Sequence, residues 1–387
     1  MKHAFVIADN IISSLGFSSK EVFENLIDGK TGIKEFNPNF LNVNFPFFAS
    51  AIDNERLANE LSLFKLPKKY TRFEEIVLLS ILKATENLHI DLASSKTLFI
   101  LSSTKGNVDF LEKEGNGSFS EERIYLWKTA SLVADFFNNP NQPLVVSNAC
   151  ISGLSALITA QRLIKNEIYD HIIICGADIL SRFIITGFNS LHALSPTYCA
   201  PYDILHQGLN LGEGAATIVL SSKIEENKNY IEIENGAITN DANHISGPSR
   251  TGEGLHLALL QVIKNRKSND FAFINTHGTA TIFNDNMEAI ALYRTGLSSL
   301  PVSSIKGALG HTMGAAGIIE SIISAHALIQ QIAPKTIGFK QLGTPEKINV
   351  LTENLPISQT HAIKTASGFG GCNAALILAV HSNSNKF

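Results

Sequence analysis

The sequence predicts an α/β protein whose sheets are buried between helices. Hydrophobic residues make up 44% of the 387 residues and charged residues only 17%, so the chain can bury a large core. Short runs rich in β-branched residues recur along the chain, and amphipathic stretches separate them, as in proteins whose helices cover both faces of a sheet. The expected strands cover residues 4–8, 97–102, 143–147, 171–175, 215–220, 231–239, 271–275, 301–304, 362–365 and 374–380.

Three segments are expected to be helices. In residues 73–88 the apolar positions recur with helical spacing. Residues 151–166 and 315–332 each follow a strand through a loop of small residues, which indicates an internal duplication with both loops at one site. No low-complexity linker divides the chain, and the expected seam at residues 221–229 gives two halves, 1–225 and 226–387.

Composition and charge exclude several classes of protein. Lys and Arg total 31 against 35 Asp and Glu, a net charge of −4, which argues against a basic nucleic-acid-binding protein. The apolar run at residues 5–7 is too short for a signal peptide, and residues 317–332 are interrupted by Glu320 and His326, so we expect a buried helix there and no membrane span. The four scattered cysteines predict no disulfide framework and therefore a cytoplasmic protein.

Cys150 is the first candidate catalytic residue. It follows the expected strand 143–147 and directly precedes the expected helix 151–166. At the start of a helix, the unpaired backbone N–H groups and the helix dipole favour a thiolate over a thiol. We therefore expect a nucleophile at this position, with a buried structural cysteine as the alternative.

Two histidines lie where catalytic side chains commonly lie. His277 follows the expected strand 271–275 and opens into a polar loop, and His311 lies in a turn rich in Gly and Ala. Lys306 precedes His311 closely, and a nearby cation disfavours protonation of an imidazole and keeps it a neutral N–H donor. Taken singly, each of these three residues fits an ordinary loop residue equally well.

The segment 367–373 is a glycine-rich turn before the last expected strand. It lacks the lysine of a phosphate-binding loop and the GxGxxG spacing, and it precedes a strand, so we assign it no nucleotide. Its backbone N–H groups are instead candidates for an oxyanion hole.

Five motifs occur together in a fixed order. They are Asn148-Ala149-Cys150; Pro201-Tyr202-Asp203 with Gly212-Glu213-Gly214; Asn275-Thr276-His277-Gly278-Thr279 with Asn284-Asp285; Ser304-Ile305-Lys306 with Gly310-His311; and Gly368-Phe369-Gly370-Gly371 with Asn373. In these motifs and their order the chain resembles the elongating β-ketoacyl-acyl carrier protein synthases. The resemblance spans nearly the whole chain, from residue 1 to residue 380.

The resemblance implies the thiolase fold, in which two similar halves form a five-layered α-β-α-β-α core, and a dimer of two chains. It also implies an acyltransferase reaction in which Cys150 takes an acyl group from acyl carrier protein as a thioester. Malonyl-acyl carrier protein then loses CO₂ while His277 and His311 donate hydrogen bonds to its thioester oxygen, and the enolate attacks the acyl-cysteine. No cofactor or metal is implied beyond the phosphopantetheine of the carrier protein.

The same resemblance implies roles for further residues. The backbone N–H groups of Cys150 and Phe369 form the oxyanion hole, with Phe369 as a gate, and Lys306 with Glu320 organises the site around His311. The remaining implied assignments are Thr279 and Thr281 for the pantetheine arm, Lys105 and Phe188 for the acyl pocket, and Lys65, Lys68, Lys69 and Arg72 for docking the acidic carrier protein. An ordinary solvated helix start is the alternative explanation of this basic cluster.

The chain departs from the family pattern near two of these motifs. Ala200 stands where relatives have a basic residue, and His206 and Gln207 replace an Arg-Asp pair, so we expect an altered ion-pair network there. Lys105 takes the place of an apolar residue near the acyl pocket. This substitution argues against ordinary long saturated acyl chains. The chain is also short for the family, which favours a specialised polyene or aromatic-pigment pathway, with fatty-acid synthesis as the alternative.

Two other functions stay open at this point. A non-catalytic subunit of the chain-length-factor type pairs with an active synthase in a heterodimer, in place of the homodimer otherwise expected, and the retained Cys150 argues against it. A thiolase or starter-unit synthase of the same fold uses a second cysteine or a Cys-His-Asn set, whereas this sequence supplies two histidines.

Overall fold

One large sheet bends through the middle of the protein. The computed structural model describes residues 2–67, 69–112, 119–225 and 228–382. Within these residues, eleven strands form this sheet in the order β13-β11-β10-β15-β16-β9-β1-β8-β6-β4-β5. The strands of the first arm are β1 (Phe5–Ser13), β4 (Thr97–Ser102), β5 (Leu144–Val146), β6 (His171–Asp178) and β8 (Gly214–Ser221). Those of the second arm are β9 (Asn229–Asn240), β10 (Phe273–Asn275), β11 (Pro301–Ser303), β13 (Asn349–Val350), β15 (His361–Gly368) and β16 (Cys372–Ser382).

The two arms repeat the same strand order and the same directions. In the first arm, β1 pairs antiparallel with β8 and β8 with β6, and β6, β4 and β5 run parallel. In the second arm, β9 pairs antiparallel with β16 and β16 with β15, and β15, β10 and β11 run parallel. The arms join through a short pairing of β1 with β9. This repetition is the internal duplication that the two loop-and-helix segments predict.

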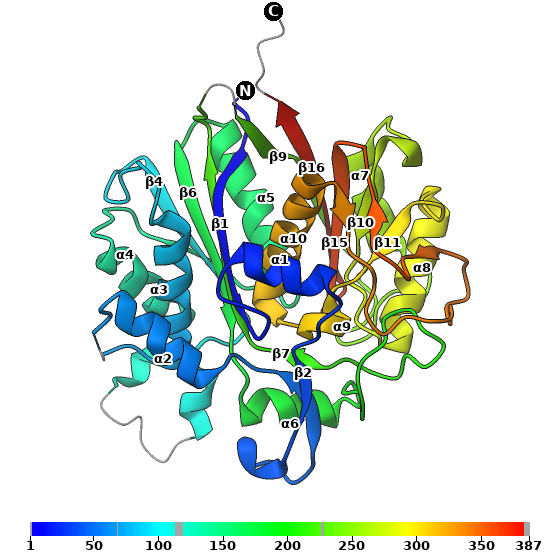
Figure 1. Cartoon of the computed structure of the whole chain (residues 1–387), viewed down its shortest axis with the longest axis horizontal. Helices are drawn as coiled ribbons and strands as arrows, with labels where there is room; N and C mark the ends of the chain where they lie inside the picture. The colour runs from blue at the N-terminus through cyan, green and yellow to red at the C-terminus, as the bar shows by residue number, and fades with distance from the viewer. Residues whose placement is uncertain (1, 68, 113–118, 226–227, 383–387) are drawn as a thin grey trace, which may run out of the picture.

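Helices fill the space between the arms and cover their outer faces (Figure 1). α5 (Ser152–Lys165) and α10 (Ala316–Gln330) pack against each other between the two arms. α3 (Arg72–Thr85) and α4 (Leu126–Phe136) cover the first arm, and α7 (Glu253–Ile263) and α8 (Ile282–Thr295) cover the second. These five layers confirm the expected α-β-α-β-α core.

Shorter elements complete the described chain. The other α-helices are α1 (Ser19–Ile27), α2 (Asn54–Leu63), α6 (Arg182–Ser190) and α9 (Lys306–Leu309). Two small sheets consist of β2 (Ile33–Phe36), β3 (Phe47–Ser50) and β7 (Leu211–Gly212), and of β12 (Ile332–Ala333) and β14 (Leu355–Pro356). The strands of these two small sheets are not among those expected from the sequence.

α10 is a core helix, as the interrupted apolar pattern predicts. The segment Met313–Gln330 is long and apolar enough to cross a membrane, but 83% of it is buried inside the fold. Its Gly317 lies so close to α5 that a Cβ atom there would stand 2.5 Å from the backbone nitrogen of Leu154. The two central helices therefore touch through their backbones, next to the loops that precede them.

The ends of the expected elements need one main correction, in β1. We expected this strand to stop before Asp9 and Asn10, but it continues to Ser13, with these two residues paired to Ile218 and Thr217 of β8. The carboxylate of Asp9 lies 3.1 Å from Nε2 of His326 on α10. The two polar residues do not end the strand, because their backbone pairs with β8 and the Asp9 carboxylate has a partner. The expected helices 73–88, 151–166 and 315–332 correspond to α3, α5 and α10 with small shifts at their ends.

Candidate active site

Cys150 lies in a sharp turn between β5 and α5. The turn is closed by hydrogen bonds from the backbone N–H of Ile151 to the carbonyl of Asn148 and from Ser152 N–H to the carbonyl of Ala149, each 3.2 Å. Ala149 has a φ of +45°, a left-handed conformation that is costly for a residue with a Cβ. Such a turn stores strain in order to direct the next side chain, and the thiol of Cys150 is buried at its tip.

The thiol of Cys150 is not held as a thiolate in the free protein, which corrects the expectation from its place before a helix. Burial raises the pKa of Cys150 to about 11, and the Lys306 ammonium and a hydrogen bond from the backbone N–H of Phe369 only partly oppose this. The cost of burying a charged sulfur opposes the thiolate that the start of a helix favours. A base must therefore take the proton when the sulfur reacts.

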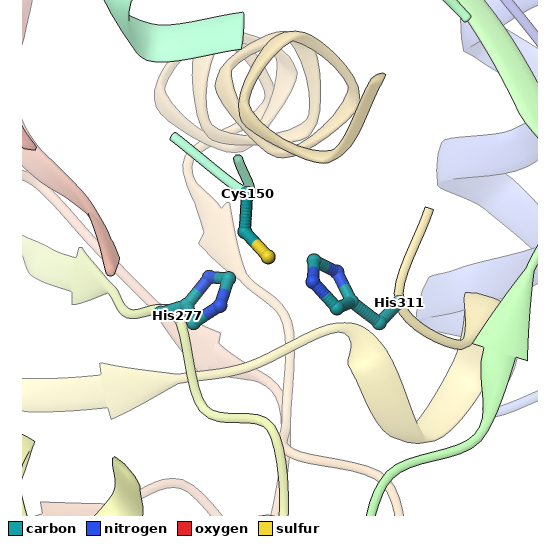
Figure 2. Close-up of side chains that lie close together, drawn as sticks. All are labelled: Cys150, His277 and His311. Carbon is teal, nitrogen blue, oxygen red and sulfur yellow. The ribbon is translucent and has the colours of Figure 1, made fainter. Parts of the chain in front are cut away.

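Cys150, His277 and His311 meet at one point, as the sequence predicts. The sulfur of Cys150 and one ring nitrogen from each of the two histidines lie within 4.8 Å of one another. The imidazole rings are perpendicular, at 88°, with centroids 5.0 Å apart. Figure 2 shows the sulfur directed between the two rings. The loop after β10, the loop after α9 and the turn before α5 thus supply one side chain each.

His277 is fixed in one tautomer by Lys306. The Nζ atom of Lys306 lies 3.3 Å from Nδ1 of His277, and since an ammonium only donates, Nδ1 accepts and the ring proton lies on Nε2. Burial, then Lys306, hold the pKa of His277 well below its usual range, so the ring stays neutral. Its backbone N–H and that of Gly278 donate to the buried carboxylate of Glu288, at 2.8 Å and 2.7 Å.

His311 is poised to bind something that enters the site. Neither of its ring nitrogens has a hydrogen-bond partner among the described residues, although the side chain is buried. Burial, then Lys306 and Lys364, hold the pKa of His311 well below its usual range. No protein group in the described part of the chain competes for these nitrogens, so both are available to a group that enters the cavity.

The Lys306–Glu320 pair contacts His277, and not His311 as the resemblance implied. Nζ of Lys306 lies 2.5 Å from Oε1 of Glu320 and donates to the backbone carbonyl of His277, also at 2.5 Å. All three groups are buried. The reason is the direction of the α9 helix, which places its first residue behind the loop of His277 while His311 follows its last turn.

Two buried groups beside this pair are not among the residues predicted from the sequence. Lys364 of β15 places its Nζ 2.6 Å from Oε2 of Glu320, and Glu288 of α8 supports the His277 loop. Each has a signal in retrospect. Lys364 is a lone cation in the apolar run 362–365, and Glu288 lies one helical turn after the Asn284-Asp285 motif.

The glycine-rich turn joins β15 to β16 directly against the Cys150 turn. A Cβ atom on Gly368 would stand 3.0 Å from the backbone nitrogen of Cys150, so any side chain there would force one of the two turns to shift. Phe369 then places its backbone N–H on the Cys150 sulfur, and its ring stacks on that of Phe188 with centroids 5.8 Å apart. The backbone N–H of Phe369 thus lies where the sequence analysis expects it.

A cavity of about 770 Å³ leads to these side chains. Cys150 and both histidines line it, and so do Phe188, Phe369, Thr279 and Thr281, while the hydroxyls of the two threonines lie 2.9 Å apart. Lys105 does not line this cavity, contrary to our expectation. Its backbone N–H donates to Asp178 and its ammonium turns back toward the carbonyl of Thr104, at 3.5 Å.

Only part of the basic cluster that we expected to dock the carrier protein is free on the surface. Lys65 and Lys69 are exposed, and Lys68 lies outside the described residues. Arg72 is a correction, because its Nε and Nη2 atoms each lie 2.8 Å from the buried carboxylate of Glu213. A guanidinium that neutralises a buried carboxylate is a structural group of the fold and is not free to bind another protein.

The departures around the Pro-Tyr-Asp motif have visible consequences. The carboxylate of Asp203 accepts backbone N–H groups from Leu205, Lys340 and Gln341. His206 is buried with Nδ1 3.3 Å from Asp285, and Gln207 lines the cavity. Ala200 offers no side-chain charge and its carbonyl closes the turn to Asp203.

Comparisons with known proteins agree with this geometry. The family model "Beta-ketoacyl synthase, N-terminal domain" matches residues 4–226, and "Beta-ketoacyl synthase, C-terminal domain" matches residues 230–340. The chain is 33% identical over 257 residues to 3-oxoacyl-[acyl-carrier-protein] synthase 2 of Rhizobium meliloti, which covers 62% of this chain and 60% of that relative. It is 26% identical over 430 residues to a putative mitochondrial 3-oxoacyl-[acyl-carrier-protein] synthase of Schizosaccharomyces pombe, which covers 97% of this chain and 98% of that relative.

Solved structures of ketosynthases share the fold. A ketosynthase in complex with its chain length factor from Xenorhabdus doucetiae superposes with a TM-score of 0.86 at 25% identity, over 98% of both chains. A β-ketoacyl synthase from Burkholderia phymatum superposes with a TM-score of 0.81 at 22% identity, over 98% of this chain and 99% of that one. The protein therefore has the thiolase fold of these condensing enzymes, and the chain belongs to the β-ketoacyl synthase family.

Proposed function

We propose that the protein is a β-ketoacyl-acyl carrier protein synthase that joins an acyl group held on Cys150 to a malonyl group. The observation that carries this proposal is the meeting of Cys150, His277 and His311 within 4.8 Å, on the wall of a cavity of about 770 Å³. One group is a nucleophile and two are neutral hydrogen-bond donors, which is the set that decarboxylative condensation requires.

In the first step the sulfur of Cys150 attacks the thioester of an acyl carrier protein. The free ring nitrogen of His311 accepts the thiol proton and passes it to the departing pantetheine sulfur, so thiol and thioester are exchanged without net charge. The backbone N–H groups of Cys150 and Phe369 stabilise the tetrahedral oxyanion. Burial that raises the thiol pKa does not prevent this step, because the proton moves as the bond forms.

In the second step malonyl-acyl carrier protein enters and loses CO₂. The bond to the carboxylate breaks, and its electron pair forms an enolate whose charge lies on the thioester oxygen. Nε2–H of His277 and an N–H of His311 donate to that oxygen in a buried site. Each donor contributes about 10²–10³-fold to the rate, the effect measured for oxyanion donors elsewhere.

In the third step the enolate carbon attacks the acyl-cysteine. The new carbon–carbon bond forms, the bond to the Cys150 sulfur breaks, and the thiolate takes a proton from solvent. Because burial strongly favours the neutral thiol, it favours reprotonation of the sulfur at the end of the cycle. The product is 3-oxoacyl-acyl carrier protein, and the carrier's phosphopantetheine is the one prosthetic group the cycle needs.

The cavity suggests where the substrates lie. Thr279 and Thr281 line it and offer hydroxyls to the amides of the pantetheine arm. Phe188 and Phe369 stack on each other at its wall, and movement of this pair would open space for the acyl chain. Exposed Lys65 and Lys69 are proposed to attract the acidic carrier protein. The proposed location is the cytoplasm.

A dimer is proposed through the edge of the sheet. β5 is the outermost strand of the first arm, and Leu144 and Val145 on it are 39% and 37% exposed. An apolar edge strand pairs readily with another chain. That chain is either a second copy or a subunit related to the chain length factor that accompanies the ketosynthase of Xenorhabdus doucetiae. The retained Cys150 argues against a non-catalytic role for this chain.

Elongation by purified protein tests the proposal. Acyl-acyl carrier protein and malonyl-acyl carrier protein are mixed with the wild type, and 3-oxoacyl product and CO₂ are measured. Cys150→Ala is expected to form no elongated product, whereas Cys175→Ala, a change of a cysteine buried between β6 and α3, retains elongation. Elongation by Cys150→Ala would refute the proposal. Activity of the wild type alone shows that no second kind of subunit is needed, and activity only with a co-purified second subunit indicates a heteromer.

A further inference from the structure

Lys364 is a buried ammonium to which none of the proposed steps gives a role. It lies in the middle of β15, paired on one side with Asn275 of β10 and on the other with Leu376 of β16. Its side chain is 0% exposed. Burial of a charged amine costs several kcal/mol unless close partners compensate it, so such a residue calls for an explanation.

Four oxygen atoms surround the Lys364 nitrogen. Three are backbone carbonyl oxygens, of Asn275 at 3.3 Å, Thr276 at 3.2 Å and Thr365 at 2.5 Å. The fourth is Oε2 of Glu320, at 2.6 Å. Backbone carbonyls together with one carboxylate form the type of oxygen cage that binds a hard cation. In this protein the cation is an ammonium that the chain itself carries.

This oxygen cage lies directly behind His277. Asn275 and Thr276 are the two residues before His277, so their carbonyls set the path of the chain into the histidine. Glu320 binds Lys364 with one oxygen and Lys306 with the other, and Lys306 contacts the Nδ1 and the carbonyl of His277. Lys364 therefore reaches His277 by two routes, through the backbone and through Glu320 and Lys306.

We propose that Lys364 is a positioning residue, an internal cation that fixes the backbone before His277 and orients Glu320 for Lys306. This inference rests on the proposed function, because it concerns the placement of an imidazole that stabilises the enolate. Without the ammonium, three carbonyls and a carboxylate oxygen lose their shared partner, and the His277 loop and Lys306 lose their common support.

The charges around Lys364 agree with this role. Burial lowers the pKa of Lys364 to about 8, and Glu320 acts against that decrease. The groups that face it are Glu320 from α10, Lys306 from α9, Glu288 from α8 and the two imidazoles. The ammonium is thus present at neutral pH and is lost as the pH rises through 8. While present, it helps to keep both imidazoles neutral.

Chemical rescue tests the cage directly. Lys364→Ala opens the space of the side chain, whereas Lys364→Met fills it without charge. Both variants are expected to lose about 10²-fold in kcat at neutral pH, the cost of a misplaced catalytic group. Ammonium or methylammonium restores Lys364→Ala saturably and leaves Lys364→Met unchanged. Lys165→Ala is the matched control, because Nζ of Lys165 donates to the carbonyl of Glu234 at the far end of α5 from Cys150. Neither this variant nor the wild type should respond to the amines.

Two further readouts separate this inference from the proposed function. Ammonium should raise the Tm of Lys364→Ala but not of Lys364→Met, a result that needs no catalysis. If the wild type does not elongate, the proposed function fails, and the Tm series still tests the cage. In an active enzyme, the fall in kcat above pH 8 should be absent from Lys364→Met.

Some results would overturn the inference. Folded Lys364→Met with wild-type kcat would do so, and so would Lys364→Ala whose Tm and activity do not respond to either amine. If Lys364→Ala does not fold, the kcat of Lys364→Met and its pH profile test the inference instead. This variant should fold, because the thioether side chain preserves the volume of the lysine stem.

Discussion

Replacing Glu320 by glutamine should strongly destabilise the protein, because one carboxylate neutralises two buried ammonium groups. Oε1 of Glu320 lies 2.5 Å from Nζ of Lys306, and Oε2 lies 2.6 Å from Nζ of Lys364. All three side chains are at most 4% exposed. Glutamine keeps the shape of the side chain and removes only the negative charge. Both lysines then lose their closest counter-charge in a site that water does not reach.

The magnitude follows from the burial of the pair. Removing one partner of a buried ion pair costs about 3–5 kcal/mol, and here the loss affects two cations. The loss should also depend on pH. Glu320 raises the pKa of Lys364, which is about 8 in the wild type, so the variant releases this proton at a lower pH. In the unfolded chain a lysine stays protonated to about pH 10.4. Because the folded variant releases the Lys364 proton at a lower pH than the unfolded chain does, its free energy of unfolding increases as the pH rises.

Urea denaturation followed by circular dichroism, at several values from about pH 6 to about pH 8.5, measures this effect. The difference in free energy of unfolding between wild type and Glu320→Gln should be largest at the acid end and shrink toward pH 8. Glu234→Gln is the control, because Glu234 pairs with Arg266 at a third of full exposure and should cost at most about 1 kcal/mol. A loss below about 1 kcal/mol for Glu320→Gln, or one that grows with pH, would show that Glu320 does not neutralise the two buried lysines.

Three further predictions concern the site itself. Alkylation of Cys150 by iodoacetamide should quicken about tenfold per pH unit without a plateau below pH 10, since the thiol pKa is about 11; a plateau near pH 7 would contradict this. His277→Ala and His311→Ala should each slow malonyl decarboxylation about 10²–10³-fold, and unchanged CO₂ release from either would exclude that histidine as a donor. Gly368→Ala should slow acylation, because its Cβ would stand 3.0 Å from the backbone nitrogen of Cys150; acylation at the wild-type rate would show that the turn tolerates displacement.

Much of the fold follows from the sequence because the strands of buried sheets are continuous apolar runs. All ten expected strands are present, and the three expected helices are α3, α5 and α10. The meeting of Cys150 with His277 and His311 was also predictable, since each lies at the end of a strand or in a loop of small residues that a duplicated fold brings together.

The parts that could not be predicted depend on long-range pairing and on burial. Arg72 looks like a surface cation in the sequence, but its partner is Glu213, which is 141 residues away. Lys364 looks like an interruption of a strand, and its role depends on Glu320 in another layer. The helix that follows Cys150 suggested a thiolate, whereas burial of the sulfur dominates its pKa. Local sequence does not report how much water a side chain loses on folding.

The central claim is that Cys150 carries the acyl group and passes it to a decarboxylated malonyl unit. The most direct measurement maps the acyl mass by peptide mass spectrometry after incubation with acyl-acyl carrier protein, and follows it after malonyl-acyl carrier protein is added. We expect the acyl group only on the peptide that contains Cys150. It should be lost from this peptide at the rate at which 3-oxoacyl product appears. An acyl group on Cys372 instead, or one on Cys150 that malonyl-acyl carrier protein does not discharge, would contradict the account.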